Sequence, residues 1–149
     1  MPLPPYLLSA SLILCERVLH EEDGVTSAIR IVDIFYVPKK PEGAPENILP
    51  LAQAHGLVNL KAEPNHEQEH ELEFRTINTV GEVQSLGPPM KIKFTSRVGP
   101  QSPRGVTADI QLNVLVKRFG TCFLCVHLDG DEVLRTPFTI LQKPDEAKN

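Results

Sequence analysis

Apolar and polar residues alternate with a period of two along most of the chain, most clearly over residues 106–117. The even-numbered positions there are apolar: Val106, Ala108, Ile110, Leu112, Val114 and Val116. The odd-numbered positions Thr107, Asp109, Gln111 and Asn113 are polar. Because successive side chains of a strand point to opposite faces, this segment is predicted to be a half-buried β-strand. The same reading predicts strands at residues 8–18, 26–37, 57–62, 70–78, 90–95, 122–128 and 133–141, and it predicts no helix.

Turn residues separate these segments. Asp23-Gly24 and Asp129-Gly130 are hairpin signals, and Pro137 marks an edge or a bulge because it cannot donate to a strand ladder. Seven or eight strands, each with one apolar face, predict an all-β fold, an antiparallel β-sandwich of immunoglobulin-like type, with a closed barrel as the alternative. We expect one domain over residues 1–142 and a flexible charged tail over 143–149.

Two longer connections are rich in proline or glycine: residues 38–50, from Pro38 to Pro50, and residues 97–105. Each is either a partner-binding loop or a solvated connector. The net charge of −4, without a cluster of Lys and Arg, argues against a nucleic-acid partner. The apolar run from Tyr6 to Cys15 is too short to span a membrane and lacks the flanks of a signal peptide, so it predicts a buried strand.

The segment from His66 to His70 spells H-E-x-x-H, a zinc motif of metalloproteases that requires a helix to bring both imidazoles to one ion. Here Pro64 precedes the motif and a period-two strand follows it. In an extended chain the two histidines would lie about 13 Å apart. We therefore expect a solvated acidic loop and assign no metal ligand, while a metal-dependent hydrolase using His66, Glu67 and His70 remains an alternative.

Cys122 and Cys125 form a C-x-x-C within a predicted strand, where positions i and i+3 face opposite ways. We expect two reduced core thiols there, and a third at Cys15, as in a cytosolic protein. His127 is expected to be a packed or half-exposed strand residue. Asp33 is expected to face solvent, the alternative being a buried carboxylate paired with Arg30. No serine elbow or phosphate-binding glycine loop occurs, so we assign no catalytic and no cofactor-binding residue.

Several segments occur in a familiar order: Glu22-Asp23-Gly24, Asp33-Ile34-Phe35, residues 70–75, Gly120, Leu128-Asp129-Gly130 and Arg135-Thr136-Pro137-Phe138. This order resembles a family of small bacterial proteins known only as a domain of unknown function. The resemblance implies a bacterial, cytoplasmic β-sandwich with an immunoglobulin-like C-terminal part, and it brings no catalytic residues.

The expected function is therefore non-catalytic: a binding or structural module, acting as a protein-interaction subunit of a bacterial assembly. Its partner would be another protein or a second copy of the chain, not a nucleic acid or a membrane. Strand edges and the two long loops are the surfaces that could accept such a partner. The alternatives are the hydrolase described above and a small-ligand binder with a pocket between its sheets.

Overall fold

The computed structural model describes residues 2–45, 49–96 and 98–144. The regular elements of these ranges are ten strands: β1 (Leu7–His20), β2 (Thr26–Ile31), β3 (Ile34–Val37), β4 (Leu51–Ala62), β5 (Glu69–Ile77), β6 (Val83–Ser85), β7 (Met90–Lys93), β8 (Arg104–Leu115), β9 (Gly120–Leu128) and β10 (Asp131–Gln142). The prediction of an all-β chain is confirmed, whereas the predicted seven or eight strands are too few. None of the described segments is a helix long and apolar enough to cross a membrane.

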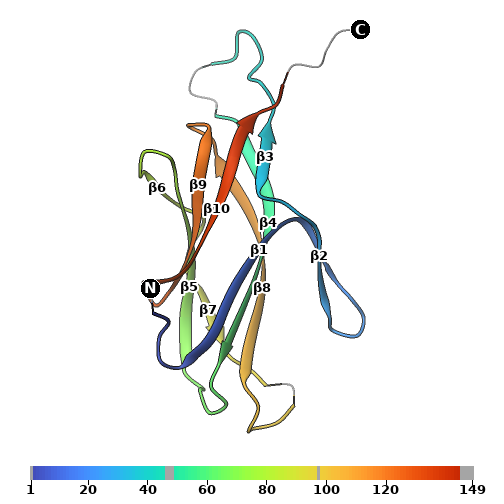
Figure 1. The fold of residues 1–149 in the computed structure, drawn as a ribbon, viewed down its shortest axis with the longest axis vertical. Coiled ribbons are helices and arrows are strands. Elements are labelled where there is room, and N and C mark those ends of the chain that lie inside the picture. Colours follow the sequence, from blue (N-terminus) through green and yellow to red (C-terminus); the bar gives the residue numbers. More distant parts are fainter. Residues whose placement is uncertain (1, 46–48, 97, 145–149) are drawn as a thin grey trace.

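The strands form two sheets that lie face to face (Figure 1). Sheet A has the order β2-β1-β4-β8, and sheet B has the order β3-β10-β9-β5-β6, with β7 also paired to β5. The prediction of two packed β-layers is therefore confirmed. The prediction of a wholly antiparallel sandwich is wrong in one place, because β3 runs parallel to β10.

The segment 26–37, predicted as one strand, divides into β2 and β3. Arg30 has a φ of 53°, a left-handed conformation that interrupts an extended chain. The chain leaves sheet A after Ile31, where β2 pairs with β1, and joins sheet B at Ile34, opposite Thr139 of β10. One segment therefore connects the two layers through Val32 and Asp33 alone.

Two further strands differ from their predicted bounds. β4 begins at Leu51 instead of residue 57, because its inward positions Ala52, Ala54 and Gly56 are small and give a weak apolar signal. At Gly56 a Cβ atom would lie 3.0 Å from Cγ1 of Ile110 on the neighbouring strand β8, so the Ile110 side chain occupies the space that a larger residue would need. β6 has three residues and was not predicted at all.

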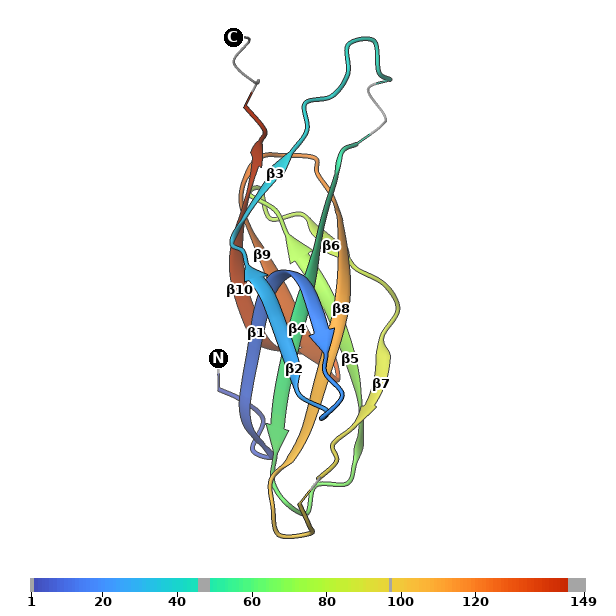
Figure 2. The same cartoon turned by 90° about the vertical axis from the view of Figure 1, so that its right-hand side faces the viewer.

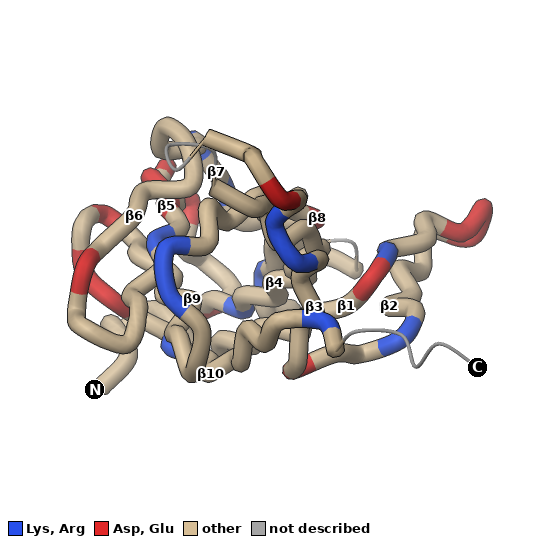
Figure 3. The backbone as a smooth tube through the Cα atoms, turned by 90° about the horizontal axis from the view of Figure 1, so that it is seen from above, with Lys and Arg blue, Asp and Glu red and all other residues tan. Residues whose placement is uncertain are grey.

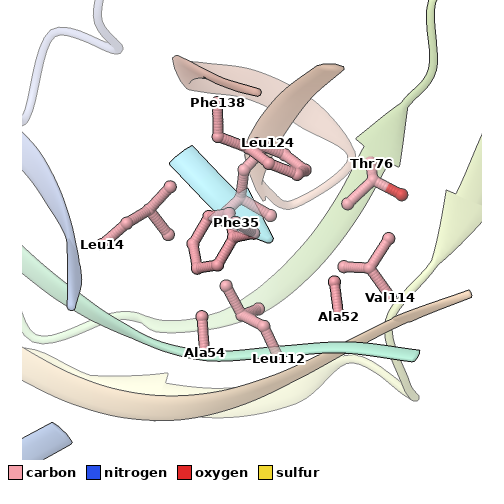
Figure 4. A pocket seen from close by; sticks show the side chains of 9 residues that line it. All are labelled: Leu14, Phe35, Ala52, Ala54, Thr76, Leu112, Val114, Leu124 and Phe138. Carbon is pink, nitrogen blue, oxygen red and sulfur yellow. The ribbon is translucent and has the colours of Figure 1, made fainter. Parts of the chain in front are cut away.

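The core fills the space between the sheets, and its fully buried side chains include Leu60, Leu72, Phe94, Leu124 and Leu128. Figure 4 shows side chains of both sheets pointing into the narrow space around Phe35. This cavity measures about 10 Å³, which is about the room that one water molecule needs. It is far smaller than the several hundred Å³ of an ordinary ligand pocket.

Both predicted hairpins are confirmed, with positive φ values at Gly24, Asp129 and Gly130. Pro137 lies at an edge, as predicted. The N–H of Thr139 donates to the carbonyl of Asp33, the residue before β3. The backbone of Pro137, two residues earlier, faces the same side of β10, where β3 has not yet begun and supplies no partner. Residues 46–48 of the predicted loop 38–50, Arg97 of the loop 97–105, and residues 145–149 of the predicted tail lie outside the described residues.

Candidate functional site

The two histidines of the H-E-x-x-H segment lie in direct contact. Their Nε2 atoms are 2.6 Å apart, and Nδ1 of His70 lies 2.5 Å from Oδ2 of Asp129. The expected separation of about 13 Å is therefore wrong. The reason is a turn in which the N–H of His66 donates to the carbonyl of Glu63, while β5 begins only at Glu69. The expected solvated loop is also wrong for His70, whose exposure is 2%.

Aromatic rings enclose this pair. The Tyr6 ring stacks on both imidazoles, at centroid distances of 4.1 Å to His66 and 4.7 Å to His70, and Phe94 meets all three rings edge-on. Burial, and then the neighbouring His70, lower the pKa of His66. Burial opposes ionisation of Asp129, but hydrogen bonds from the Glu71 N–H and from His70 outweigh it and lower the pKa of this carboxyl group.

The geometry is that of a hydrogen-bonded Asp129–His70–His66 chain. Two imidazoles on one tetrahedral zinc ion, with Zn–N bonds of about 2.0–2.1 Å, would hold their nitrogens about 3.3 Å apart, which is wider than the 2.6 Å observed. Oε1 of Glu67 accepts a hydrogen bond from Arg104 at 3.2 Å. Among the described residues, no group of three His, Cys, Asp or Glu side chains is arranged to hold a metal ion. The three residues link the β4–β5 turn, β5 and the β9–β10 turn, and the stacked Tyr6 ring adds the segment before β1.

The cysteines face as predicted. Cys122 packs into the core, Cys125 lies on the opposite face of β9, and all three cysteines are free thiols. Cys125 is fully buried even so, because Arg75 and Arg135 lie directly opposite it on the two neighbouring strands. Burial, and then a hydrogen bond to Glu132, raise the pKa of this thiol to about 11, so it is held in its unreactive protonated form.

The remaining single residues also match their predictions. His127 is half-buried on β9, and Asp33 is exposed. Arg30 approaches Glu16, with Nε 3.5 Å from Oε1, instead of Asp33.

A cluster that was not predicted lies on the outer face of sheet A. Oδ1 of Asp109 lies 3.2 Å from Nδ1 of His55, and Oδ2 lies 3.4 Å from Nε2 of His20. His20 ends β1, so this carboxylate connects the β1–β2 hairpin to β8. These residues are far apart in the chain, and only the order of the strands brings them together.

The edge of sheet A at β8 has no strand partner along most of its length. β8 is twelve residues long and pairs with β4 on one side. On its other side, the described part of the chain supplies one bridge, between Thr95 and Gly105. Figure 2 shows β8 as the last strand of this sheet, with β7 of sheet B lying further to the side.

The direction of the free backbone groups follows from two sets of hydrogen bonds. Val116 donates its N–H to Pro50, which continues the β4 ladder, whereas Gly105 exchanges hydrogen bonds with Thr95 on the opposite side. Because backbone direction alternates along a strand, even-numbered residues of β8 face β4 and odd-numbered residues face the free edge. The edge residues beyond Gly105 are Thr107, Asp109, Gln111, Asn113 and Leu115.

The apolar side of β8 is also incompletely covered. Val106, Ala108 and Ile110 pack against the core but stay half-exposed. The corresponding inward residues of β4, such as Val58 and Leu60, are fully buried because β4 has strands on both sides. Unpaired backbone groups and half-exposed apolar side chains therefore lie along the same edge.

Comparison with known proteins adds no assignment. No family model and no curated protein matches the chain. One solved structure with a similar arrangement is the Pseudomonas fluorescens alkylpurine DNA glycosylase AlkC bound to DNA containing an abasic site analog. The match has 8% identity and a TM-score of 0.41, and it covers 87% of this chain but only 30% of the glycosylase chain. At this level of similarity it supports no statement about the function of the present protein.

Proposed function

We propose that the protein is a non-catalytic interaction module that binds an extended segment of a partner protein as an added strand beside β8. The observation that carries the proposal is the unpaired backbone edge from Thr107 to Leu115. An exposed sheet edge is a template for another strand, and main-chain hydrogen bonds supply affinity in this mode of recognition.

The other side chains of the molecule favour this proposal over the alternatives. His70 and the Cys125 thiol are both buried, and neither they nor His66 and Asp129 line the cavity between the sheets. The cavity around Phe35 has room for about one water molecule. The hollow that opens between the sheets at the end of β8 measures about 200 Å³, which is less than the roughly 300–1,000 Å³ of an ordinary ligand pocket. These observations do not favour the metal-dependent hydrolase, and they do not favour a small-ligand binder with its pocket between the sheets.

The test uses one position of the edge and two substitutions. Peptides that bind the wild-type protein are selected from a displayed library and are titrated against Gln111→Pro and Gln111→Ala. Gln111→Pro removes an N–H that faces the free edge and leaves the β4 ladder intact, as proline is tolerated at sheet edges. Gln111→Ala removes the side chain but keeps the N–H.

We expect Gln111→Pro to abolish binding, Gln111→Ala to bind within about twofold of wild type, and both variants to unfold cooperatively. The amides of Thr107, Asp109 and Gln111 should exchange hydrogen more slowly in the complex. Equal binding by the proline variant, or amide protection confined to another surface, would refute strand addition at β8.

The finer predictions from sequence belong to the same proposal. These are the immunoglobulin-like topology, membership of the bacterial family of unknown function, a cytoplasmic location, and a role within an assembly. They rest on the order of turn and core residues along the chain.

A further inference from the structure

The two ends of the β8 edge open into hollows flanked by lysine and arginine. The hollow at the start of β8 measures about 650 Å³, and its lining includes Lys61, Lys93, Thr95 and Thr107. The hollow at the other end measures about 200 Å³, and its lining includes Lys117 and Arg118 beside Val114 and Val116. An added strand that follows β8 would run from one hollow to the other.

These cations have no carboxylate partner within the described residues. Lys61, Lys93, Lys117 and Arg118 are all exposed. In contrast, Arg75, Lys91, Arg104 and Arg135 each form an ion pair with a nearby glutamate. Figure 3 shows basic and acidic residues interspersed along the backbone of a chain whose net charge is −4. Four cations that form no ion pair within the described part of the chain therefore flank the two ends of one free edge.

The acidic groups near this edge are already engaged. Asp109, in the middle of β8, holds His20 and His55. Glu82, in the lining of the second hollow, accepts a hydrogen bond from Asn78 at 2.9 Å. The side of β8 that faces the core is apolar instead of charged, and its residues Val106, Ala108 and Ile110 stay half-exposed.

We infer that the occupant of the β8 edge is an amphipathic extended segment of a partner protein, with apolar residues at alternate positions in its centre and acidic residues at both ends. This inference rests on the proposed function and deepens it. The apolar residues lie beside Val106, Ala108 and Ile110, where they exclude water from the open side of the core. The acidic residues lie within reach of the four unpaired cations, and complementary charge selects this partner over neutral or basic strands.

The test uses three synthetic peptides with the same central alternation of valine and threonine. One carries two aspartates at each end, one carries two lysines at each end, and one carries two serines at each end. We expect the acidic peptide to bind at least tenfold more tightly than the serine peptide at low salt, with the difference shrinking as ionic strength rises. The lysine peptide should bind most weakly.

Two double substitutions test whether the lysines at the start of β8 contact the acidic peptide. Lys61→Ala combined with Lys93→Ala should weaken the acidic peptide at least threefold and leave the serine peptide unchanged. Lys40→Ala combined with Lys143→Ala removes the same charge from exposed positions elsewhere and should change neither peptide.

Two outcomes separate this inference from the proposed function. Equal affinities for the three peptides, all lost in Gln111→Pro, would overturn the acidic partner and leave strand addition at β8 in place. If Gln111→Pro still preferred the acidic peptide, the binding site of that peptide would lie away from the free edge, and both proposals would be overturned.

Discussion

The Asp129 carboxylate supports the buried end of the histidine chain, and its removal gives a quantitative test of this cluster. Oδ2 of Asp129 binds Nδ1 of His70, which is 2% exposed, and Oδ1 accepts the N–H of Glu71 at 2.9 Å. Asp129 also has a φ of 52°, a conformation that aspartate and asparagine tolerate better than alanine.

The magnitude follows from these contacts. A hydrogen bond to a charged group contributes about 1.5–3 kcal/mol, and we take the lower half of this range because the Asp129 side chain is 48% exposed. The left-handed conformation adds about 1 kcal/mol for alanine. Asp129→Ala should therefore lose about 3 kcal/mol of unfolding free energy, or about 6–12 °C in thermal midpoint for a chain of this length. Asp129→Asn keeps the turn and the Glu71 bond, and should lose about 1 kcal/mol because a neutral bond replaces a charge-assisted one.

The assay is urea unfolding followed by far-UV circular dichroism, since the chain has no tryptophan. The midpoint should fall for both variants at an unchanged slope. Asp131→Ala, at an exposed position of the same hairpin, is the control and should stay within about 0.5 kcal/mol of wild type. A loss of less than about 0.5 kcal/mol in Asp129→Ala would refute the account of this cluster.

Three further predictions concern other parts of the molecule. Because the pKa of His66 is lowered by burial and by His70, unfolding should take up a proton as the pH falls below about 6.5. The thermal midpoint should therefore fall with pH in that range, and the fall should be smaller in His66→Gln. Gly120 has a φ of +121°, and a Cβ there would lie 2.9 Å from Cγ2 of Thr79. Gly120→Ala should thus lower unfolding free energy by about 2–3 kcal/mol, against about 1 kcal/mol for Gly130→Ala, where nothing lies within 4 Å; comparable losses in urea titrations would contradict the steric argument. With a pKa of about 11, Cys125 should react with iodoacetamide at neutral pH at least about a hundredfold more slowly than a free cysteine, and all three thiols should react in denaturant. Rapid labelling of native Cys125, located by mass spectrometry, would be the contrary result.

The alternating pattern predicted the strands whose two faces differ strongly, and the structure differs from it where local signals are weak. Residues 106–117 alternate between large apolar and polar side chains, and β8 lies there. The first half of β4 was missed because Ala52, Ala54 and Gly56 are inward-facing but small. The division of 26–37 depends on a left-handed Arg30, a residue type with no preference for that conformation.

The candidate site was even less accessible to sequence reasoning. The contact between His66 and His70 depends on a turn from Glu63 to His66. Its central residues Pro64 and Asn65 are common turn residues, but a turn signal alone does not give the distance between the side chains that follow it. The free edge of β8 depends on the order of strands within the sheet, and a pattern of apolar and polar residues does not encode that order. The sequence showed that strand edges must exist, but it could not show which strand carries one.

The parallel pair of β3 and β10 also has a consequence for the order in which the molecule can be built. All strands of sheet A precede residue 116, so that layer can assemble while the chain is still being synthesised. β3 pairs with residues 139–142 of β10, which leave the ribosome about one hundred residues, or about 5–20 s, later. Throughout this interval β3 has no neighbour in its sheet, and the part of sheet A that packs against β10 has no opposing strand. A nascent chain that stops before β10 thus leaves β3 unpaired and exposes the apolar side chains that pack against Phe138 and Ile140.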